Sequence, residues 1–376
     1  MKSASLLHIA DSERDADMRY AIGVPVSDPF IFLRSGGRSV VVLNDLEVDR
    51  VKANGQVNRV LPMSRYLRQA KHRGAKMPGL ADAAAALCRD SKVKKVTVPF
   101  SFPAGVARQL RKLGLRVKIR DGWFLPEREF KTAAEVKMIS AALMMAEVGM
   151  AEGIHALKRA KIGRDRRLVL HGVPLTSEKI RSIIETAVLQ AGGVATNTIV
   201  AQGSQACDPH ERGHGPLVAN VPVVLDIFPR SARTGYHGDV TRSVVRGRAS
   251  EAVRRQYMTV LKGQSIAFSM LRDGISGADV HAAVERHFRA EGYRTGRQKG
   301  QAVGFFHSTG HGLGLEIHEL PRASRTSECI LRAGHVVTIE PGLYYPDTGG
   351  IRLEDVALIT NAEPQNLTQF EKVLEI

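Results

Sequence analysis

The chain has 376 residues, of which 43% are apolar and 24% charged, and its formal net charge is +16. That length indicates two domains, and the ordinary apolar content excludes a wholly disordered chain. The excess of positive charge is the unusual figure, because it first points to an anionic partner such as nucleic acid or a membrane surface.

Three widely separated cysteines, Cys88, Cys207 and Cys329, form no Cys-x-x-Cys pair and no disulfide framework. This usage favours a reducing compartment. The N-terminal segment lacks the apolar region of a signal peptide, and no apolar run reaches the roughly 18 residues that a membrane helix requires. We therefore expect a soluble cytoplasmic protein with no membrane partner.

The first third of the chain alternates short strand-like runs with helical patterns. Strands are predicted at residues 30–33, 40–43, 96–100 and 116–119, and helices at 79–89 and 104–113. Such alternation is typical of a small α/β domain. We assign residues 1–122 to this N-terminal domain.

A second domain is expected to follow the charged segment 123–131, which we interpret as a linker. Thr132 and Glu135 have the spacing of a capping box, in which each side chain satisfies a free amide at the start of a helix. Apolar residues then recur at helical spacing. We therefore expect residues 132–376 to form the second domain, beginning with a helix.

The positive charge is concentrated in the first domain. Residues 1–130 contain 24 Lys+Arg and 13 Asp+Glu, a net charge of +11, whereas residues 131–376 contain 30 and 25, a net charge of +5. The basic residues are scattered and are not interleaved with the aromatic side chains that stack on single-stranded nucleic acid. A solvated basic surface is the simpler interpretation, and we expect no nucleic-acid partner.

Carboxylates interrupt apolar runs in the second domain. Asp226 lies inside the strand-like run Val223–Ile227, and Asp239 lies in Thr234–Arg242, which we interpret as the hairpin partner of that strand. Because a buried carboxylate is costly unless a cation compensates it, two on paired strands can converge on one metal ion. A hydrogen-bonded structural role is the alternative for either residue alone.

Two later strand-like runs each carry a glutamate among apolar residues. Glu340 lies in the first run, and Glu354 lies in the second, residues 350–356. In the second run a period of two places Arg352 and Glu354 on one face and Asp355 on the other.

The segment 307–319 places several glycines around His307 and His311. Its spacing fits neither the dinucleotide-binding fingerprint nor the phosphate loop. The two histidines are four residues apart, as in helical zinc motifs, but the glycines argue against a helix. We expect the glycines to allow a close approach of the backbone to a site.

The second domain thus supplies four carboxylates and one imidazole, from Asp226, Asp239, His311, Glu340 and Glu354. Five such ligands exceed what one divalent ion needs, and they carry enough negative charge to hold two cations, as in dinuclear hydrolases. The donor set suits Mn²⁺ first, and also Co²⁺, Fe²⁺ or Zn²⁺.

Four segments resemble, in the same order, motifs of the creatinase/aminopeptidase P/prolidase family of metallopeptidases, family M24: DIFPRSARTGYHGDVTR, HSTGHGLGLEIHELP, TIEPGLYYP and GGIRLEDV. The resemblance covers the chain from about residue 130 onward and is nearest to the prolidases. It implies an α/β (α+β) fold, in which a small N-terminal α/β creatinase-like domain precedes a pita-bread catalytic domain. That catalytic domain is a curved, mainly antiparallel sheet covered by helices. The family also implies a homodimer.

The resemblance implies a role for each metal ligand. Asp239 and Glu354 would bridge two divalent ions, and Asp226, His311 and Glu340 would be the remaining ligands. A metal-bridging hydroxide would attack the scissile carbonyl. Glu340 would then relay the proton to the departing prolyl nitrogen.

The resemblance also implies substrate-binding residues, which are His210, His307, His318, Arg322 and Arg352. His210 and His318 would additionally be catalytic, by stabilising the tetrahedral intermediate. His214 is a rival for the role of His210, which we favour because a proline precedes it. Arg322 would pair with the carboxylate of a dipeptide, and a plain surface arginine is the alternative.

The spacing between Asp226 and Asp239 departs from the family. Twelve residues separate them, two more than is usual. If the extra residues lie in the 229–234 turn, both aspartates keep their strand positions, whereas a bulge would displace Asp226. We expect the turn, because the TGYHGDVTR segment matches the family closely.

The function implied is hydrolysis of the Xaa–Pro bond in dipeptides or short peptides that carry proline at the second position. The prolyl nitrogen has no N–H, so a dedicated pocket is expected. One alternative is an Xaa-Pro aminopeptidase acting on longer peptides. Methionine aminopeptidases usually lack the first domain, and creatinase lacks the ligands. A non-catalytic pita-bread protein with a basic nucleic-acid-binding surface is the alternative of another class, and the filled ligand positions argue against it.

Overall fold

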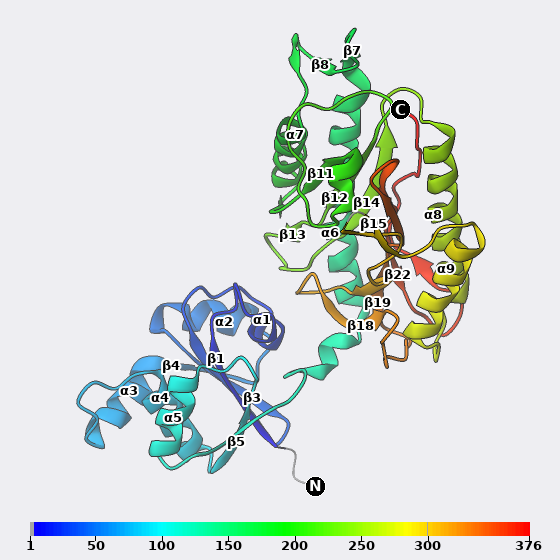
Figure 1. Ribbon diagram of the computed structural model, residues 1–376. Helices are drawn as coiled ribbons and strands as arrows, with labels where there is room; N and C mark the ends of the chain where they lie inside the picture. Colours follow the sequence, from blue (N-terminus) through cyan, green and yellow to red (C-terminus); the bar gives the residue numbers. More distant parts are fainter. Residues whose placement is uncertain (1–3, 299) are drawn as a thin grey trace. The chain divides into compact units, whose positions relative to one another are not determined.

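The structure, a computed structural model, describes residues 4–298 and 300–376 (Figure 1). The chain divides into two compact units, Met1–Arg128 and Glu129–Ile376, called unit 1 and unit 2 below. The division falls within residues 123–131, where Pro126–Glu129 form a short 3-10 helix, η2. No helix in the described part of the chain is long and apolar enough to cross a lipid bilayer.

Unit 1 contains one six-stranded mixed sheet. Its strands are β1 (Ser5–Ala10), β2 (Phe30–Ser35), β3 (Arg38–Leu43), β4 (Arg59–Pro62), β5 (Lys95–Val98) and β6 (Arg116–Ile119). Its helices are α1 (Ala16–Ile22), α2 (Val48–Asn54), α3 (Met63–His72), α4 (Leu80–Asp90) and α5 (Ala104–Lys112), with the 3-10 turn η1 (Asp45–Glu47). The strand order is β4-β3-β2-β1-β5-β6, and β1, β2 and β3 pair antiparallel. The remaining pairs are parallel, as expected where helices connect the strands.

Strand β2 shows why its sequence reads as a continuous apolar run. Phe30 and Phe32 pack into one hydrophobic cluster with α1 and α2. Ile31 and Leu33 point the other way and pack with α3, α4 and α5. Helices therefore cover both faces of the sheet, so every residue of this strand segment must be apolar.

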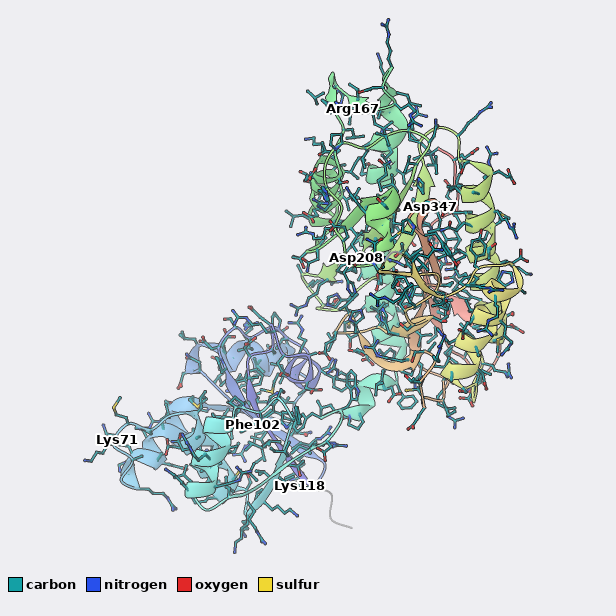
Figure 2. The ribbon with its side chains drawn as sticks, viewed as in Figure 1. Lys71, Phe102, Lys118, Arg167, Asp208 and Asp347 are labelled. Carbon is teal, nitrogen blue, oxygen red and sulfur yellow. The ribbon has the colours of Figure 1, made fainter. Side chains whose placement is uncertain are left out.

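The basic residues of unit 1 occupy more than one part of its surface. Lys71 on α3 and Lys118 on β6 are both exposed and lie far apart on unit 1 (Figure 2). β4, which leads into α3, and β6 form opposite edges of the sheet. Basic side chains therefore lie at separate places on unit 1.

The described residues of unit 2 form four α-helices and several antiparallel sheets. The helices are α6 (Ala133–Arg159), α7 (Ser177–Gln190), α8 (Glu251–Met270) and α9 (Gly277–Ala290). The main strands are β11 (Ile199–Gln202), β12 (Pro222–Ile227), β14 (Val240–Val245), β17 (Gly310–Gly312), β18 (Glu319–Ala323), β19 (Val336–Ile339), β20 (Gly342–Tyr345), β21 (Gly349–Arg352) and β22 (Asp355–Leu358). Shorter elements are β7 (Lys161–Ile162), β8 (Leu168–Leu170), β9 (Val173–Pro174), β10 (Gly193–Val194), η3 (Gly203–Cys207), β13 (Arg230–Ser231), β15 (Gly296–Gln298), β16 (Gln301–Val303) and β23 (Gln365–Asn366).

The strands of unit 2 lie between two helix pairs (Figure 1). One core joins α6 and α7 to β12 and β14, and a second joins α8 and α9 to β19 and β22. Every pairing between named strands in the described part of this unit is antiparallel. The expectation of a mainly antiparallel sheet covered by helices is confirmed.

Helix α6 begins at the predicted capping box. The Glu135 amide donates to Thr132 Oγ1 at 3.3 Å, and the Thr132 amide donates to Glu135 Oε2 at 2.8 Å. The Glu135 carboxylate also accepts a hydrogen bond from the Tyr236 hydroxyl at 2.8 Å. The start of this helix is therefore fixed to the turn that precedes β14.

Residues 350–356 do not form the single strand that was predicted. β21 ends at Arg352 and β22 begins at Asp355, so Leu353 and Glu354 lie between two sheets. The Glu354 amide instead donates to the Thr241 carbonyl at 3.1 Å. This bridge to β14 interrupts the strand. The alternation of apolar and polar residues in 350–356 does not indicate such an interruption.

Candidate active site

A cavity of about 380 Å³ in unit 2 gathers the predicted site residues. Fifteen residues line it, and they include all ten that the sequence singled out. These ten are His210, Asp226, Asp239, His307, His311, His318, Arg322, Glu340, Arg352 and Glu354. They come from segments as far as 144 positions apart in the chain, residues 210 to 354.

Two neighbouring strands position the aspartates. Asp226 lies in β12 opposite Thr241 in β14, and Asp239 immediately precedes β14. The hairpin partner is thus shorter than predicted, since residues 234–239 are not strand. Residues 228–239 connect the two strands, and both aspartates line the cavity. That the two extra residues lie in the 229–234 turn stays a prediction.

The His311 imidazole presents one ring nitrogen to two carboxylates. Its Nδ1 lies 3.0 Å from the Gly312 carbonyl oxygen, which can only accept, so Nδ1 carries the proton. The unprotonated Nε2 lies 3.8 Å from Asp239 Oδ2 and 3.4 Å from Glu340 Oε1. Burial lowers the pKa of His311 to about 3, and His318 adds to this effect. A neutral imidazole of this kind is suited to bind a metal ion.

Two glycines allow the short strand β17 to lie where it does. A Cβ atom on Gly310 would lie 1.7 Å from the Thr338 carbonyl oxygen, and one on Gly312 would lie 2.1 Å from the Leu320 carbonyl oxygen. The predicted close approach of the backbone is therefore present. It brings β17 against its neighbouring chain segments and so fixes the position of His311 between them.

Thr241 joins two of the carboxylates. Its hydroxyl lies 2.9 Å from Asp226 Oδ1 and 2.6 Å from Glu354 Oε2. One hydroxyl proton can serve only one of these oxygens, so the second contact calls for another proton or a cation nearby. The sequence analysis did not single out Thr241, although it lies two residues after Asp239.

The buried carboxylates are poorly compensated within the protein. Burial, and then the charges of Glu354 and Asp226, raise the pKa of Asp239 well above its ordinary value. Burial, followed by Glu340 and Asp226, does the same for Glu354. Burial is also the main reason that the pKa of Glu340 rises to about 7. Such a group of acids favours the binding of cations.

Arg352 is the buried cation of the cavity. Its Nη2 donates to Asp226 Oδ2 at 2.6 Å, and its Nη1 donates to the Tyr344 hydroxyl at 3.0 Å. Together with the exposed Arg322, two guanidiniums face four carboxylates in the lining, which leaves a charge of −2 when all four are ionised. Carboxylate oxygens and one imidazole are ligands that fit divalent ions such as Mn²⁺. Among the described residues, ligand atoms of Asp239, His311 and Glu354 all lie within 4.8 Å of one another.

Tyr344 is a second residue that the sequence analysis missed. The His307 Nδ1 lies 2.8 Å from the Ser308 carbonyl oxygen, so Nδ1 carries the proton and Nε2 accepts from the Tyr344 hydroxyl at 2.8 Å. The Tyr344 oxygen in turn accepts from Arg352. Burial raises the pKa of Tyr344 to about 12 and lowers that of His307 to about 3. A chain of hydrogen bonds therefore connects Asp226 to His307. Tyr344 lies in the TIEPGLYYP segment, and its position in that motif could have indicated that it belongs to the site.

The other histidines lie at the cavity wall. The His318 ring meets the His311 ring edge to face, with centroids 4.5 Å apart. His210 is exposed and lines the cavity, whereas its rival His214 is not among the lining residues. Arg322 is exposed on β18 and also lines the cavity.

A buried ion pair supports the segment that carries His318. Lys131 Nζ lies 2.7 Å from Glu319 Oε2, and each side chain is only 1% exposed. The Lys131 amide donates to the Gly334 carbonyl at 2.7 Å, which fixes the start of unit 2 to the chain before β19. Lys131 and Glu319 are 188 positions apart, and no sequence pattern predicts that they form an ion pair.

Comparison with known proteins agrees with this geometry. The model of metallopeptidase family M24 matches residues 137–361. The chain belongs to this family. An Xaa-Pro dipeptidase of Pyrococcus horikoshii is 30% identical over 285 residues, which cover 75% of each chain. An Xaa-Pro dipeptidase of Pyrococcus furiosus is 31% identical over 248 residues, covering 66% of this chain and 65% of that protein.

Solved structures share the fold of this M24 metallopeptidase. The prolidase of Pyrococcus horikoshii superposes with a TM-score of 0.78 at 25% identity, covering 99% of this chain and 95% of that one. An X-Pro aminopeptidase of Thermotoga maritima gives a TM-score of 0.82 at 21% identity, covering 99% and 97%. The expectation of a pita-bread metallopeptidase fold, preceded in the chain by a smaller α/β domain, is confirmed.

Proposed function

We propose that this M24 metallopeptidase hydrolyses the Xaa–Pro bond of dipeptides or short peptides with the help of two divalent metal ions. One observation carries the proposal: four carboxylates and one neutral imidazole converge in a single cavity whose buried cation is Arg352. A peptidase without metal would gain nothing from such a costly concentration of buried acids.

The residues proposed to hold the metal ions are Asp226, Asp239, His311, Glu340 and Glu354. Mn²⁺ is the first choice, and Co²⁺, Fe²⁺ or Zn²⁺ would fit the same donors. Ions of this kind, when bound, lower the pKa of a water molecule and polarise a carbonyl group. Asp226 is held in place by Arg352 and Thr241, and His311 by the Gly312 carbonyl, so these donors are fixed before any ion arrives.

Other residues of the cavity would bind the substrate and move the proton. His318 adjoins His311, and its pKa is lowered by burial and by Arg322, so it is neutral at pH 7 and can donate a hydrogen bond to a substrate carbonyl. His210, at the wall of the same cavity, is proposed to share this role. The Glu340 carboxylate is proposed to pass a proton to the prolyl nitrogen, which needs one to leave as an amine.

The choice between dipeptides and longer peptides depends on Arg322. Its exposed side chain lines the cavity and offers a charge-assisted pair to the carboxylate of a dipeptide. His307, Tyr344 and Arg352 would form the neighbouring wall. The names of the curated relatives favour a dipeptidase, and an Xaa-Pro aminopeptidase is the second candidate.

The setting of the enzyme is part of the proposal. The three cysteines are unpaired in the structure, which suits a reducing cytoplasm. We propose a homodimer on the family resemblance. No nucleic-acid partner is proposed, because the basic residues of unit 1 are not interleaved with aromatic side chains in the sequence.

Hydrolysis of a small peptide panel tests the proposal. The metal-depleted full-length protein is supplemented with Mn²⁺ and offered Ala-Pro, Ala-Pro-Ala and, as a control, Ala-Ala. Metal-dependent cleavage of Ala-Pro alone supports the dipeptidase, and cleavage of Ala-Pro-Ala supports the aminopeptidase. A protein that binds no metal, cleaves none of these peptides and binds DNA with a steep salt dependence would reverse the proposal in favour of the binding protein.

A further inference from the structure

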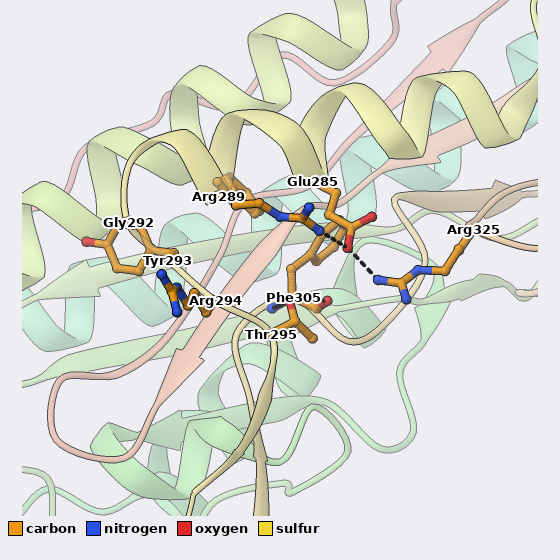
Figure 3. A pocket seen from close by; sticks show the side chains of 9 residues that line it. Glu285, Arg289, Gly292, Tyr293, Arg294, Thr295, Phe305 and Arg325 are labelled. Carbon is orange, nitrogen blue, oxygen red and sulfur yellow. Dashed lines mark hydrogen bonds and ion pairs between the residues drawn. The ribbon is translucent and has the colours of Figure 1, made fainter.

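A second cavity lies beside helix α9, outside the candidate active site. Its volume is about 550 Å³, within the range of roughly 300–1,000 Å³ typical of small-molecule sites. The nine residues that line it come from α9, from the chain on either side of the β15–β16 hairpin, and from the loop after β18 (Figure 3). None of the nine lines the candidate active site.

The lining of this cavity is positively charged. It contains Arg289, Arg294 and Arg325 against one acid, Glu285, a net charge of +2. Arg325 and Arg289 reach the Glu285 carboxylate from opposite sides (Figure 3). Both bind the same oxygen, Oε1, and Arg289 Nη2 lies 3.5 Å from it. Each guanidinium has five N–H groups, so most of them stay available to a ligand.

Arg294 has no such partner. Its side chain makes no hydrogen bond or ion pair with any residue that the structure describes. Its backbone is nevertheless held, because the Tyr345 hydroxyl donates to the Arg294 carbonyl at 2.8 Å. The next residue, Thr295, exchanges hydrogen bonds of 3.0 and 3.1 Å with the backbone of Phe305. The cavity thus carries a cation without a counter-charge on a fixed chain segment.

Aromatic side chains form the apolar part of the wall. Phe288 and Phe305 pack edge to face, with centroids 5.3 Å apart, and Tyr293 lies beside them in the lining. Flat apolar groups pack well against such rings. The Phe305 ring also lies edge to face with the His307 ring, with centroids 5.4 Å apart, and His307 lines the candidate active site.

We propose that this cavity binds a small organic anion that joins a flat ring to a phosphate or carboxylate group. The anionic group would bind Arg294 and the free N–H groups of Arg289 and Arg325, in charge-assisted hydrogen bonds. The ring would pack on the half-buried Tyr293, because Phe288 and Phe305 are only 1% and 2% exposed. The proposal stands on this cavity alone and does not depend on which peptide the enzyme cleaves.

Calorimetric titration of the full-length protein with phenyl phosphate tests the proposal. The protein is treated with a chelator, so that no metal in the active site can bind the phosphate. We expect one saturable site, and we expect Arg294→Gln or Arg289→Gln to weaken it about tenfold or more, the effect of losing a hydrogen bond between charged groups. Benzoate and inorganic phosphate then show whether the site prefers a phosphate or a carboxylate, and whether it needs the ring.

Arg286→Gln is the matched control. Arg286 is exposed on the same helix, beside Glu285, but it does not line the cavity. Unchanged affinity in this variant, with the loss in the other two, supports the proposal. Equal weakening in all three variants would show a general effect of surface charge and would overturn it. So would binding that Arg294→Gln leaves intact, or the absence of saturable binding.

Discussion

Arg352 donates a 2.6 Å hydrogen bond to Asp226, and both side chains are buried in the wall of the candidate active site. The pair gives one of the four crowded carboxylates a buried counter-charge. Removing the cation would leave that carboxylate buried and uncompensated, which costs more than an intact pair contributes.

Arg352→Gln is therefore expected to destabilise unit 2 by about 3 kcal/mol. Urea unfolding of the metal-free protein, followed by circular dichroism, measures the change. Arg286→Gln, an exposed arginine on α9, is expected to change the stability by less than about 0.5 kcal/mol. Equal midpoints for wild type and Arg352→Gln would show that the pair is not structurally important.

Glu354→Gln is expected to lose metal and activity together. The substitution keeps the shape of the side chain but removes a charge that the cluster with Asp239 and His311 needs. Metal content by mass spectrometry and Mn²⁺-supplemented hydrolysis of Ala-Pro should both fall, the rate by about 100-fold or more. Glu328→Gln, exposed and outside the cavity, is the control. A metal-loaded Glu354→Gln protein with full activity would refute the assignment.

Lys131→Met is expected to cost about 3–5 kcal/mol of folding free energy, because it leaves Glu319 buried without its ion pair. The double variant Lys131→Met/Glu319→Leu should recover part of that loss, since it removes the stranded charge. Arg332→Gln breaks an exposed pair with Asp273 and should cost no more than about 1 kcal/mol. A double variant as unstable as the sum of both single variants would contradict the coupling.

His335 is expected to make the protein less stable in mild acid. Its Nδ1 accepts a 3.0 Å hydrogen bond from the Arg332 amide, and burial, with Lys131 and Arg332, lowers its pKa to about 4. Between pH 4 and the unfolded value of about 6.5, only the unfolded chain binds this proton. The stabilisation is therefore present above pH 6.5 and is lost as the pH falls toward 4.

The variant His335→Asn isolates this effect, because an amide oxygen can replace the Nδ1 acceptor without titrating. Thermal unfolding at pH 7.5 and pH 5 measures it. Wild type should lose about 2 kcal/mol more than the variant over this interval. Identical pH dependence in the two proteins would assign the acid sensitivity to other histidines.

Five of the ten residues that line the candidate active site were expected from their own sequence context, and the resemblance to family M24 added the other five. Asp226 and Glu340 stand out as charges inside apolar runs, and His311 stands between two glycines. Local patterns of this kind can be recognised in the sequence without knowledge of the fold. The capping box at Thr132 is another, since its two members are neighbours in the chain.

Contacts between distant segments could not be found in this way. Lys131 and Glu319 are each ordinary charged residues in the sequence, and only the folded chain brings them together. The break between β21 and β22 depends on the bridge from Glu354 to Thr241, 113 residues earlier. The cavity beside α9 could not be predicted either, because its arginines are spread along 37 residues and no local motif joins them.

Gly310 and Gly312 have a consequence for how this protein can change over evolutionary time. Every other amino acid adds a Cβ atom, and at both positions that atom would overlap a carbonyl oxygen of the adjoining chain. Any substitution at either neighbour of His311 would therefore require the backbone to move. The position of the His311 imidazole thus depends on the absence of side chains at the two neighbouring residues.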